Sequence, residues 1–252
     1  MAIRVCDGGE KMIKKKDENR AMIPQITVPW YLLEEVTKYA KRKGIKKTAA
    51  ARELLTIGME KVNFELMQKS QKAPLLLWLD VETTGLYADK NAVIEFGIIT
   101  DRAGQIIDRH KLRVAPFPND IIDDDALKVN LRTREEIASY PDPLEVAEML
   151  MHIFAHNHNA GEKYFLAGWC PGFDKGFLDA FFRKCGYTVP DIFDRHTVDV
   201  FSKYFDAYQL EEYKLDHFVK KYLPEEYDEK KLHSALYDID MARKLYFLKQ
   251  GV

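Results

Sequence analysis

The stretch LLLWLDVETTGL, residues 75–86, decides the fold of the larger part of this chain. Its first five residues are apolar without helical spacing, which is typical of a short strand buried on both faces of a helix-covered sheet. Asp80 and Glu82 follow directly, and because side chains alternate along a strand, both carboxylates point to the same side. A divalent cation held by oxygen ligands would compensate their repulsion and desolvation. The alternative is a strand that runs out into solvent with two surface acids at its end.

The composition indicates a water-soluble protein with room for two domains. The chain has 252 residues, of which 46% are hydrophobic and 31% charged, and neither a signal peptide nor an apolar run of the roughly 20 residues that span a bilayer is visible. Its three cysteines are odd in number and far apart, which favours free thiols in a reducing compartment: Cys6, Cys170 and Cys185. We therefore predict a cytoplasmic location and no membrane partner.

The net charge of -2 hides an asymmetry between the two ends of the chain. Residues 1–72 contain 16 Lys and Arg against 9 Asp and Glu, a net charge of +7, and the remainder contains 22 against 31, a net charge of -9. A basic small module joined to an acidic large one predicts that the first binds a polyanion and the second uses clustered acids. Chance and solubility are the simpler explanation.

The first 74 residues predict a flexible basic arm, a small module and a linker. The arm covers residues 1–21 and the module residues 22–62, and residues 63–74 are expected to be the tail of the second helix and then a linker. In the module, residues 23–28 alternate as in a strand, Pro29 opens a helix that ends at Gly44, and Thr48 has the character of an N-cap for a second helix.

This order of one strand and two helices, in PQITVPWYLLEEVTKYAKRKGIKKTAAARELLTIGM (residues 24–59), resembles the ribbon-helix-helix DNA-binding family. The resemblance implies a homodimer through residues 22–62, whose paired strands lie in the major groove of duplex DNA. It also implies that Gln25 and Thr27 face the bases and that the helix start at Thr48 binds a phosphate, beside Lys46 and Lys47. A dimerisation module with no role in nucleic-acid binding is the alternative.

The rest of the chain predicts a mixed sheet with helices on both sides. Strands are expected at residues 75–82, 92–100, 105–114 and 164–169, and a hairpin loop at 101–104. Helices are expected at residues 144–154, 174–184, 215–222 and 233–248, and Asp123–Asp125 fit the N-cap and first turn of another.

Two further segments carry acids that could meet the first pair. In GWCPGFDKGFLDAFF (168–182), Asp174 lies at a strand-to-helix transition. In KLHSALYDIDMARKLY (231–246), His233 stands at the expected helix start, and Asp238 lies more than one turn further on. Taken singly, each has an ordinary explanation, since acids are favoured at helix N-termini and on surfaces.

Together, LDVETTGL, GFDKGFL and HSALYD resemble the three motifs of the DnaQ-like (DEDDh) 3′–5′ exonuclease family, and Glu95-Phe96-Gly97 also fits. The resemblance covers about residues 75–250 and implies a ribonuclease H-like fold. It also implies that two Mg²⁺ or Mn²⁺ ions are held by four acids: Asp80, Glu82, Asp174 and Asp238. His233 would be the general base, and the terminal nucleotide of a single-stranded or 3′-ended nucleic acid would be bordered by Thr83, Thr84, Leu86 and Phe173. The chain departs from the family at Cys170, where an Asn is usual.

These patterns leave three functions open. The first is a metal-dependent 3′–5′ exonuclease that releases nucleoside 5′-monophosphates and is tethered by its N-terminal module. The second, favoured by the ending HSALYDI, resembles oligoribonuclease and acts on short RNA. The third is a ribbon-helix-helix repressor whose large domain is not catalytic. The sequence does not separate DNA from RNA, because that choice depends on contacts to the 2′-hydroxyl.

Overall fold

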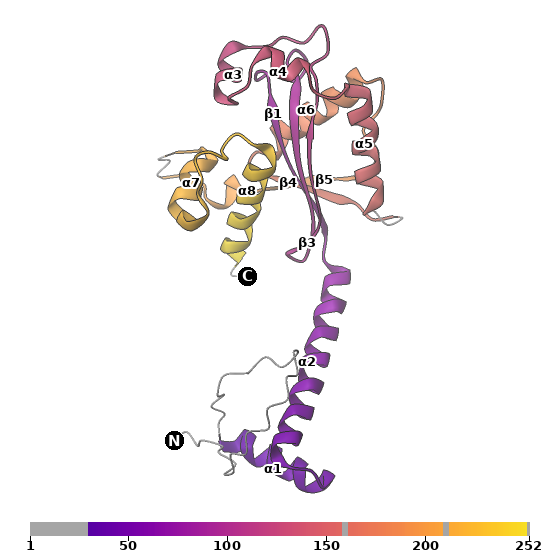
Figure 1. The fold of residues 1–252 in the computed structure, drawn as a ribbon, viewed down its shortest axis with the longest axis vertical. Helices are drawn as coiled ribbons and strands as arrows, with labels where there is room; N and C mark the ends of the chain where they lie inside the picture. Colours follow the sequence, from indigo (N-terminus) through magenta and orange to yellow (C-terminus); the bar gives the residue numbers. More distant parts are fainter. Residues whose placement is uncertain (1–29, 158–160, 209–211, 251–252) are drawn as a thin grey trace, which may run out of the picture. The chain divides into compact units, whose positions relative to one another are not determined.

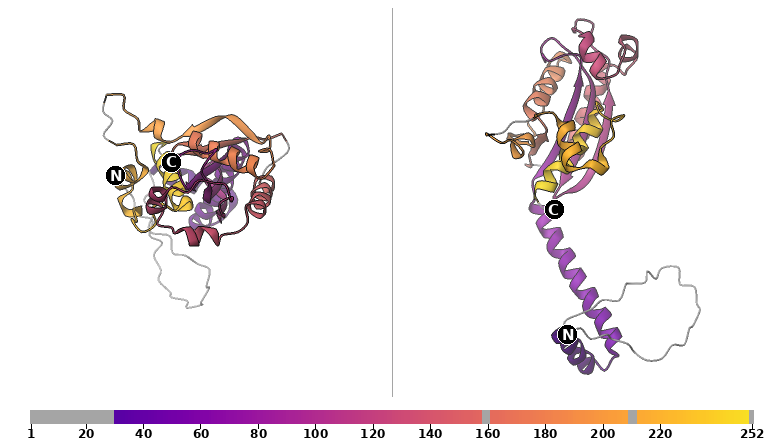
Figure 2. Two further views of the ribbon diagram at one scale, coloured as in Figure 1. Left: turned by 90° about the horizontal axis from the view of Figure 1, so that it is seen from above. Right: turned by 90° about the vertical axis from the view of Figure 1, so that its left-hand side faces the viewer.

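The computed structural model describes residues 30–157, 161–208 and 212–250 and divides into two compact units (Figures 1 and 2). Residues 1–71 form unit 1 and residues 72–252 form unit 2. The predicted arm and the predicted strand at 23–28, with Gln25 and Thr27, lie outside the described residues.

Unit 1 contains the two expected helices, α1 (Trp30–Lys43) and α2 (Lys47–Lys72). Helix α1 stops just before Gly44, which has a φ of +67° and so adopts the left-handed conformation that glycine tolerates best. One prediction needs correction. Helix α2 starts at Lys47, so Thr48 lies in its first turn rather than at its N-cap. The segment at residues 63–74 was expected to be the tail of the second helix and then a linker, and α2 extends to Lys72. The sequence NFELMQKSQK suits a helix because it contains neither Gly nor Pro and consists mainly of good helix formers.

Unit 2 is built on one five-stranded sheet with the order β3-β2-β1-β4-β5. Its strands are β1 (Leu75–Thr83), β2 (Val93–Arg102), β3 (Gln105–Arg113), β4 (Tyr164–Gly168) and β5 (Phe193–Asp199). Strands β1, β2 and β3 pair antiparallel, whereas β4 pairs parallel with both β1 and β5. Strand β5 had not been predicted, because its mixed sequence FDRHTVD alternates poorly.

The central strand β1 sends alternate side chains into two separate cores. Leu75, Leu77 and Leu79 pack on one face of the sheet with α5 (Pro143–His156) and α6 (Pro171–Lys184). Leu76 and Trp78 pack on the other face with α7 (Leu215–Tyr222) and α8 (Ala235–Gln250). Figure 1 shows the two helical layers on opposite sides of the strands. The fold is therefore the expected ribonuclease H-like mixed sheet covered on both sides.

Two short helices, α3 (Asp124–Val129) and α4 (Arg134–Ala138), connect β3 to α5, and two 3₁₀ turns, η1 (Phe201–Lys203) and η2 (Pro224–Glu226), flank α7. Asp123 is the N-cap of α3, as predicted. Helix α6 begins at Pro171 rather than at residue 174, because proline suits the first helical position. Helix α8 begins at Ala235 rather than at His233, whose φ of +59° is incompatible with a helix. Within the described residues, no helix has both the length and the apolar character needed to cross a membrane.

Candidate active site

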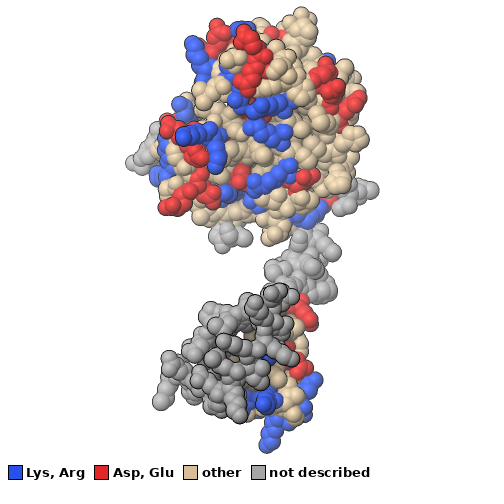
Figure 3. All heavy atoms as spheres, viewed as in Figure 1, with Lys and Arg blue, Asp and Glu red and all other residues tan. Residues whose placement is uncertain are grey.

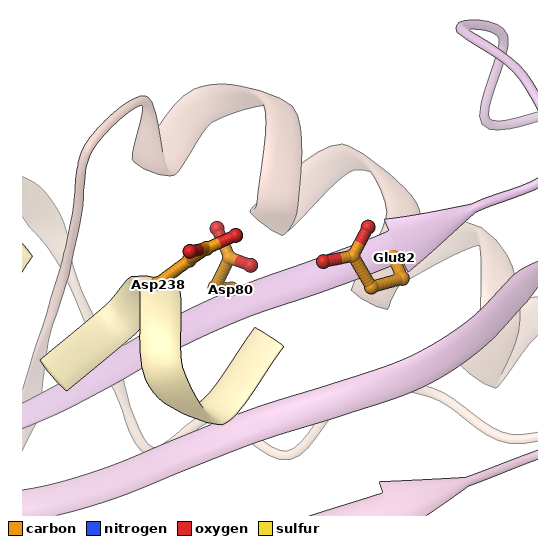
Figure 4. Close-up of side chains that lie close together, drawn as sticks. All are labelled: Asp80, Glu82 and Asp238. Carbon is orange, nitrogen blue, oxygen red and sulfur yellow. The ribbon is translucent and has the colours of Figure 1, made fainter. Parts of the chain in front are cut away.

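Strand β1 and helix α8 bring three carboxylates together. The alternation that buries Leu76 and Trp78 under α8 continues along β1, so Asp80 and Glu82 point to the α8 side of the sheet. Asp238 extends from the first turn of α8 toward them (Figure 4). Ligand oxygens of Asp80, Glu82 and Asp238 lie within 4.8 Å of one another. Residues 158 positions apart in the sequence thus share one small site.

The close approach of α8 depends on a glycine. Gly97 on β2 pairs with Asp80 on β1, and the start of α8 lies directly over it. A Cβ added to Gly97 would lie only 2.2 Å from the carbonyl carbon of Ala235. The absence of a side chain at this position is therefore what lets the helix that carries Asp238 reach the strand that carries Asp80.

Glu95 on β2 holds the start of α8 in place. This buried residue lies directly opposite Glu82 in the antiparallel pair, where two like charges would repel each other. Its carboxylate accepts a hydrogen bond from the Ala235 N–H at 3.0 Å and forms an ion pair with Lys111 at 3.0 Å. The Glu95 carboxylate is thus already engaged by the helix terminus and by Lys111. Glu82 is therefore the carboxylate of this pair that remains available to a metal.

Asp174 approaches from the opposite side of β1. It lies in the first turn of α6, is 4% exposed, and its Oδ1 accepts a hydrogen bond from the Val81 N–H at 3.1 Å. Val81 stands between Asp80 and Glu82 in the sequence, so Asp174 is anchored beside both. The structure therefore brings all four predicted acids to one place, three with converging oxygens and the fourth held next to them by the backbone.

The acids perturb one another electrostatically. Burial, reinforced by the charges of Asp174 and Glu82, raises the pKa of Asp80 well above its usual range. Burial, together with Glu95, raises the pKa of Glu82 to about 7. Burial also raises the pKa of Asp174 to about 7, against the opposing hydrogen bond from Val81, and burial is the main cause of a strongly raised pKa at Asp238. Four carboxylates that resist ionisation side by side fit a hard divalent cation, which would supply the missing positive charge.

His233 lies at the entrance to the acid cluster. It precedes α8 by two residues, and its backbone N–H donates to Asp238 Oδ2 at 3.1 Å. Burial lowers the pKa of its imidazole, so the ring is neutral at pH 7 and able to accept a proton. The unusual positive φ of this residue is a local strain of the kind found at functional sites.

A hollow of about 970 Å³ opens beside the acids and is lined by three of the predicted substrate contacts, Thr83, Leu86 and Phe173. Leu86 is 76% exposed and is free to meet a ligand. The prediction for Thr84 needs correction, because its side chain is fully buried and its hydroxyl donates to the Ile121 carbonyl at 2.7 Å. Thr84 holds the loop in place and offers no contact surface.

Four other predicted positions have simpler surroundings. Cys170 is exposed and precedes α6 as its N-cap, where its side chain forms no capping hydrogen bond. In unit 1, three of the predicted DNA contacts are exposed at the start of α2: Lys46, Lys47 and Thr48.

A row of basic residues beside the site was not predicted from the sequence. Arg109, Lys111 and Arg113 occupy alternate positions of β3, so they share one face, and they pair in register with Ile99, Gly97 and Glu95. Their i, i+2, i+4 spacing in QIIDRHKLR is a signal that could have revealed them. Asn130 was also missed; it is buried, and its side-chain amide donates to the Thr83 carbonyl at 2.8 Å.

A mixed five-stranded sheet of this order, with carboxylates clustered beside its central strand, defines the class of ribonuclease H-like nucleases. The exonuclease family (RNase_T) matches residues 77–246, more than half of the chain, and this protein therefore belongs to that family. No curated protein matches the chain in a comparison of sequences.

Solved structures share the fold at low sequence identity. The zinc-bound complex of E. coli exonuclease I with single-stranded DNA is 16% identical with a TM-score of 0.59, over 71% of this chain and 41% of that one. A 3′-exonuclease that recognises the histone mRNA stem-loop is 16% identical with a TM-score of 0.56, over 71% of this chain and 83% of that one. The nuclease domain of 3′hExo, a DEDDh family member bound to rAMP, is 17% identical with a TM-score of 0.54, over 71% and 94%. The chain thus spans about two fifths of exonuclease I and most of the other two.

Proposed function

We propose that this protein is a metal-dependent 3′–5′ exonuclease that releases nucleoside 5′-monophosphates from nucleic acid. The observation that carries the proposal is the convergence of Asp80, Glu82 and Asp238 within 4.8 Å, with Asp174 anchored beside them. Hard oxygen ligands of this kind suit Mg²⁺ or Mn²⁺. Two such ions, when bound, supply a water of lowered pKa and stabilise the charge on the leaving 3′ oxygen.

Other side chains are assigned the roles of general base and of contacts to the terminal nucleotide. His233, neutral at pH 7, takes the proton of the attacking water at its imidazole. Glu82, at the edge of the large hollow, accepts a hydrogen bond from the terminal 3′-hydroxyl as well as binding metal. Phe173 and Leu86 line the same hollow and pack against the sugar and base of the terminal nucleotide.

The test uses a 5′-labelled single-stranded oligonucleotide. Wild-type protein is expected to shorten it from the 3′ end only with Mg²⁺ or Mn²⁺, and Asp80→Ala and Asp174→Ala are expected to reduce the rate by about 100-fold or more. Asp191→Ala is the matched control, because its carboxylate is 99% exposed and pairs with Lys163. A double Asp80→Ala/Asp174→Ala variant that digests as fast as wild type would refute the assignment.

The nucleic acid can be DNA or RNA. The similar structures hold single-stranded DNA in one case and rAMP in another, which supports either sugar as a substrate for this fold. Rates on matched DNA and RNA oligomers of several lengths separate a general exonuclease from an enzyme specialised for short RNA.

We further propose that unit 1 forms a ribbon-helix-helix dimer that binds duplex DNA. The two helices follow one another as the motif requires, and α2 exposes Leu55, Ile57 and Met59, which are 52%, 48% and 66% exposed in the single chain. Exposed apolar side chains on a small unit favour cover by a second copy. Deletion of residues 1–62 is expected to give a monomer that hydrolyses oligonucleotides but binds duplex more weakly. An oligomeric state that survives the deletion would contradict the paired ribbon, and tight operator binding without hydrolysis in any divalent metal would favour a repressor.

A further inference from the structure

His233 stands where three hollows meet. The first, of about 970 Å³, lies between the end of β1 and α3 and is the one assigned above to the terminal nucleotide. The second, of about 460 Å³, lies between β3 and the loop at residues 228–234. The third, of about 550 Å³, lies toward the start of α7. If the first takes the 3′-terminal nucleotide, one of the other two receives the chain on the 5′ side of the scissile phosphate.

Charge distinguishes these hollows. Among the described residues, and leaving out the proposed metal ligands Asp80 and Asp238, the third hollow is lined by Lys214 and Asp216 and is close to neutral. The first, without the proposed ligand Glu82, has Lys128 against three acids: Asp123, Asp124 and Asp125. The second is strongly basic, because the described residues that line it include one acid, Asp240, and five cations: Arg109, Lys111, Arg132, Lys230 and Lys231. A polyanion that passes His233 is therefore attracted most strongly into the second hollow.

The basic side chains beside this hollow outnumber the acids with which they pair. Glu95 is the shared partner of Lys111, Arg113 and Arg132, at 3.0, 3.6 and 3.8 Å. Arg109 also pairs with Asp240 at 2.9 Å, and Arg132 with Glu136 at 3.5 Å. Four cations thus share three carboxylates, which leaves a surplus of positive charge, to which Lys230 adds. Figure 3 shows lysine and arginine side chains gathered across the middle of one face of unit 2.

The walls of the basic hollow are held in place before any ligand arrives. The Tyr237 hydroxyl accepts a hydrogen bond from the Asp228 N–H at 2.9 Å and donates to the Glu226 carbonyl at 2.9 Å, which ties the loop to α8. The Asp228 carboxylate accepts from the Lys230 N–H at 3.1 Å and pairs with Lys231 at 3.1 Å. These bonds hold the backbone of the loop that carries Lys230 and Lys231, and a segment that is already ordered loses less freedom on binding a ligand than a mobile one.

An apolar side chain also lines the basic hollow. Leu131 is 74% exposed there and has a φ of +53°, a conformation that costs a non-glycine residue free energy. The hollow therefore combines several cations with an exposed apolar contact. This combination matches single-stranded nucleic acid, which presents both phosphates and base faces.

We infer that the groove lined by β3 and residues 228–234 carries the phosphates of the nucleotides on the 5′ side of the scissile bond, and that the enzyme therefore prefers polynucleotide chains to dinucleotides. The inference rests on the proposed function, since it extends the substrate path from that site. The inference is incompatible with an enzyme specialised for dinucleotide substrates, because a dinucleotide leaves the groove unfilled.

The test compares two substrates of the wild-type enzyme and two variants. Thymidine 5′-monophosphate p-nitrophenyl ester has one phosphodiester bond and no nucleotide on the 5′ side, whereas the single strand dT20 fills the groove. The variants are Lys230→Ala/Lys231→Ala and the control Lys163→Ala. Lys163 lies just before β4, and β4 pairs with the start of β1, at the end of the sheet away from the site. Melting temperatures check that both variants are folded.

The double variant is expected to raise KM for dT20 about fivefold or more, and by more than it raises KM for the ester. Its log–log salt dependence is expected to become shallower by roughly 0.7 for each phosphate that the variant no longer neutralises. Lys163→Ala is expected to match wild type in both respects. An unchanged KM and salt slope on dT20, or equal losses on the two substrates, would overturn the inference.

A failure of the proposed function looks different. In that case wild-type protein hydrolyses neither substrate with Mg²⁺ or Mn²⁺. The groove is then judged by the fluorescence anisotropy of labelled dT20 in EDTA. Weaker binding by the double variant with a shallower salt slope supports a phosphate-binding groove, and binding equal to wild type rules it out.

Discussion

Gly97→Ala is the substitution that most directly probes how the site is assembled. The new Cβ would lie 2.2 Å from the Ala235 carbonyl carbon and 2.4 Å from the Leu236 nitrogen, whereas ordinary contact begins at 3.4 Å. Both neighbours are backbone atoms and cannot rotate away. The start of α8 must therefore move by about 1.2 Å, the difference between 3.4 and 2.2 Å.

This displacement moves Asp238 away from Asp80 and Glu82. A misplacement of about 1 Å in a catalytic constellation costs on the order of 100-fold in rate, and overpacking of this kind destabilises a protein by about 1–3 kcal/mol. We expect Gly97→Ala to remain folded, to lose about 100-fold in the rate of oligonucleotide hydrolysis at saturating Mn²⁺, and to unfold at a lower urea concentration than wild type.

Gly176→Ala is the matched control. This glycine lies inside α6, and a Cβ built on it meets no atom within 4 Å. Alanine is favoured over glycine inside helices by roughly 0.5–1 kcal/mol, so this variant should be slightly more stable than wild type and equally active. A Gly97→Ala enzyme with activity within about threefold of wild type and an unchanged urea midpoint would refute the idea that this glycine seats α8.

Three further predictions concern ionisable groups. Without divalent metal, the free energy of unfolding should fall as pH rises from 5 to 8. In the folded protein the pKa values of Glu82 and Asp174 are about 7 instead of the ordinary 4.5 and 3.8, so the folded protein binds more protons than the unfolded chain in this window. Mg²⁺ added at pH 7 should release protons, detectable with an indicator dye, and no release would argue against a metal bound by these acids. Arg243→Met should lower the free energy of unfolding in urea by about 3–5 kcal/mol, because it leaves the fully buried Asp101 carboxylate, 2.5 Å from the guanidinium, without its partner. Adding Asp101→Leu to Arg243→Met should recover most of that loss. Equal stability of the single and double variants would contradict this account. Burial raises the pKa of the Cys185 thiol to about 11. Its alkylation by iodoacetamide at pH 8, followed by mass spectrometry, should therefore be about two orders of magnitude slower than that of a free thiol. Rapid labelling would show that the thiol is accessible and ionised.

The local pattern of the sequence was enough to place the first two acids. Alternation along β1 determines that Asp80 and Glu82 share a face, and the apolar run before them indicates a central strand. The helices that carry Asp174 and Asp238 were also predicted, each within three residues of its observed start. These features depend on neighbours in the sequence, where periodicity is informative.

The features that the sequence did not reveal depend on residues far apart. The Glu95 carboxylate binds the N–H of Ala235, 140 positions away, and no local pattern indicates that interaction. The positive φ of His233 likewise follows from the way α8 is seated, although HSALYD reads as a continuous helix start.

The origin of the acids has a consequence for synthesis of the protein. The cluster draws on β1, α6 and α8, and its last member, Asp238, lies 158 residues after Asp80. Chains emerge from the ribosome N-terminus first, at about 5–20 residues per second. Between the appearance of Asp80 and that of Asp238, roughly 8–30 seconds at these rates, the nascent chain holds an incomplete set of acids. A growing or prematurely terminated chain that ends before Asp238 therefore lacks one of the acids of the candidate site.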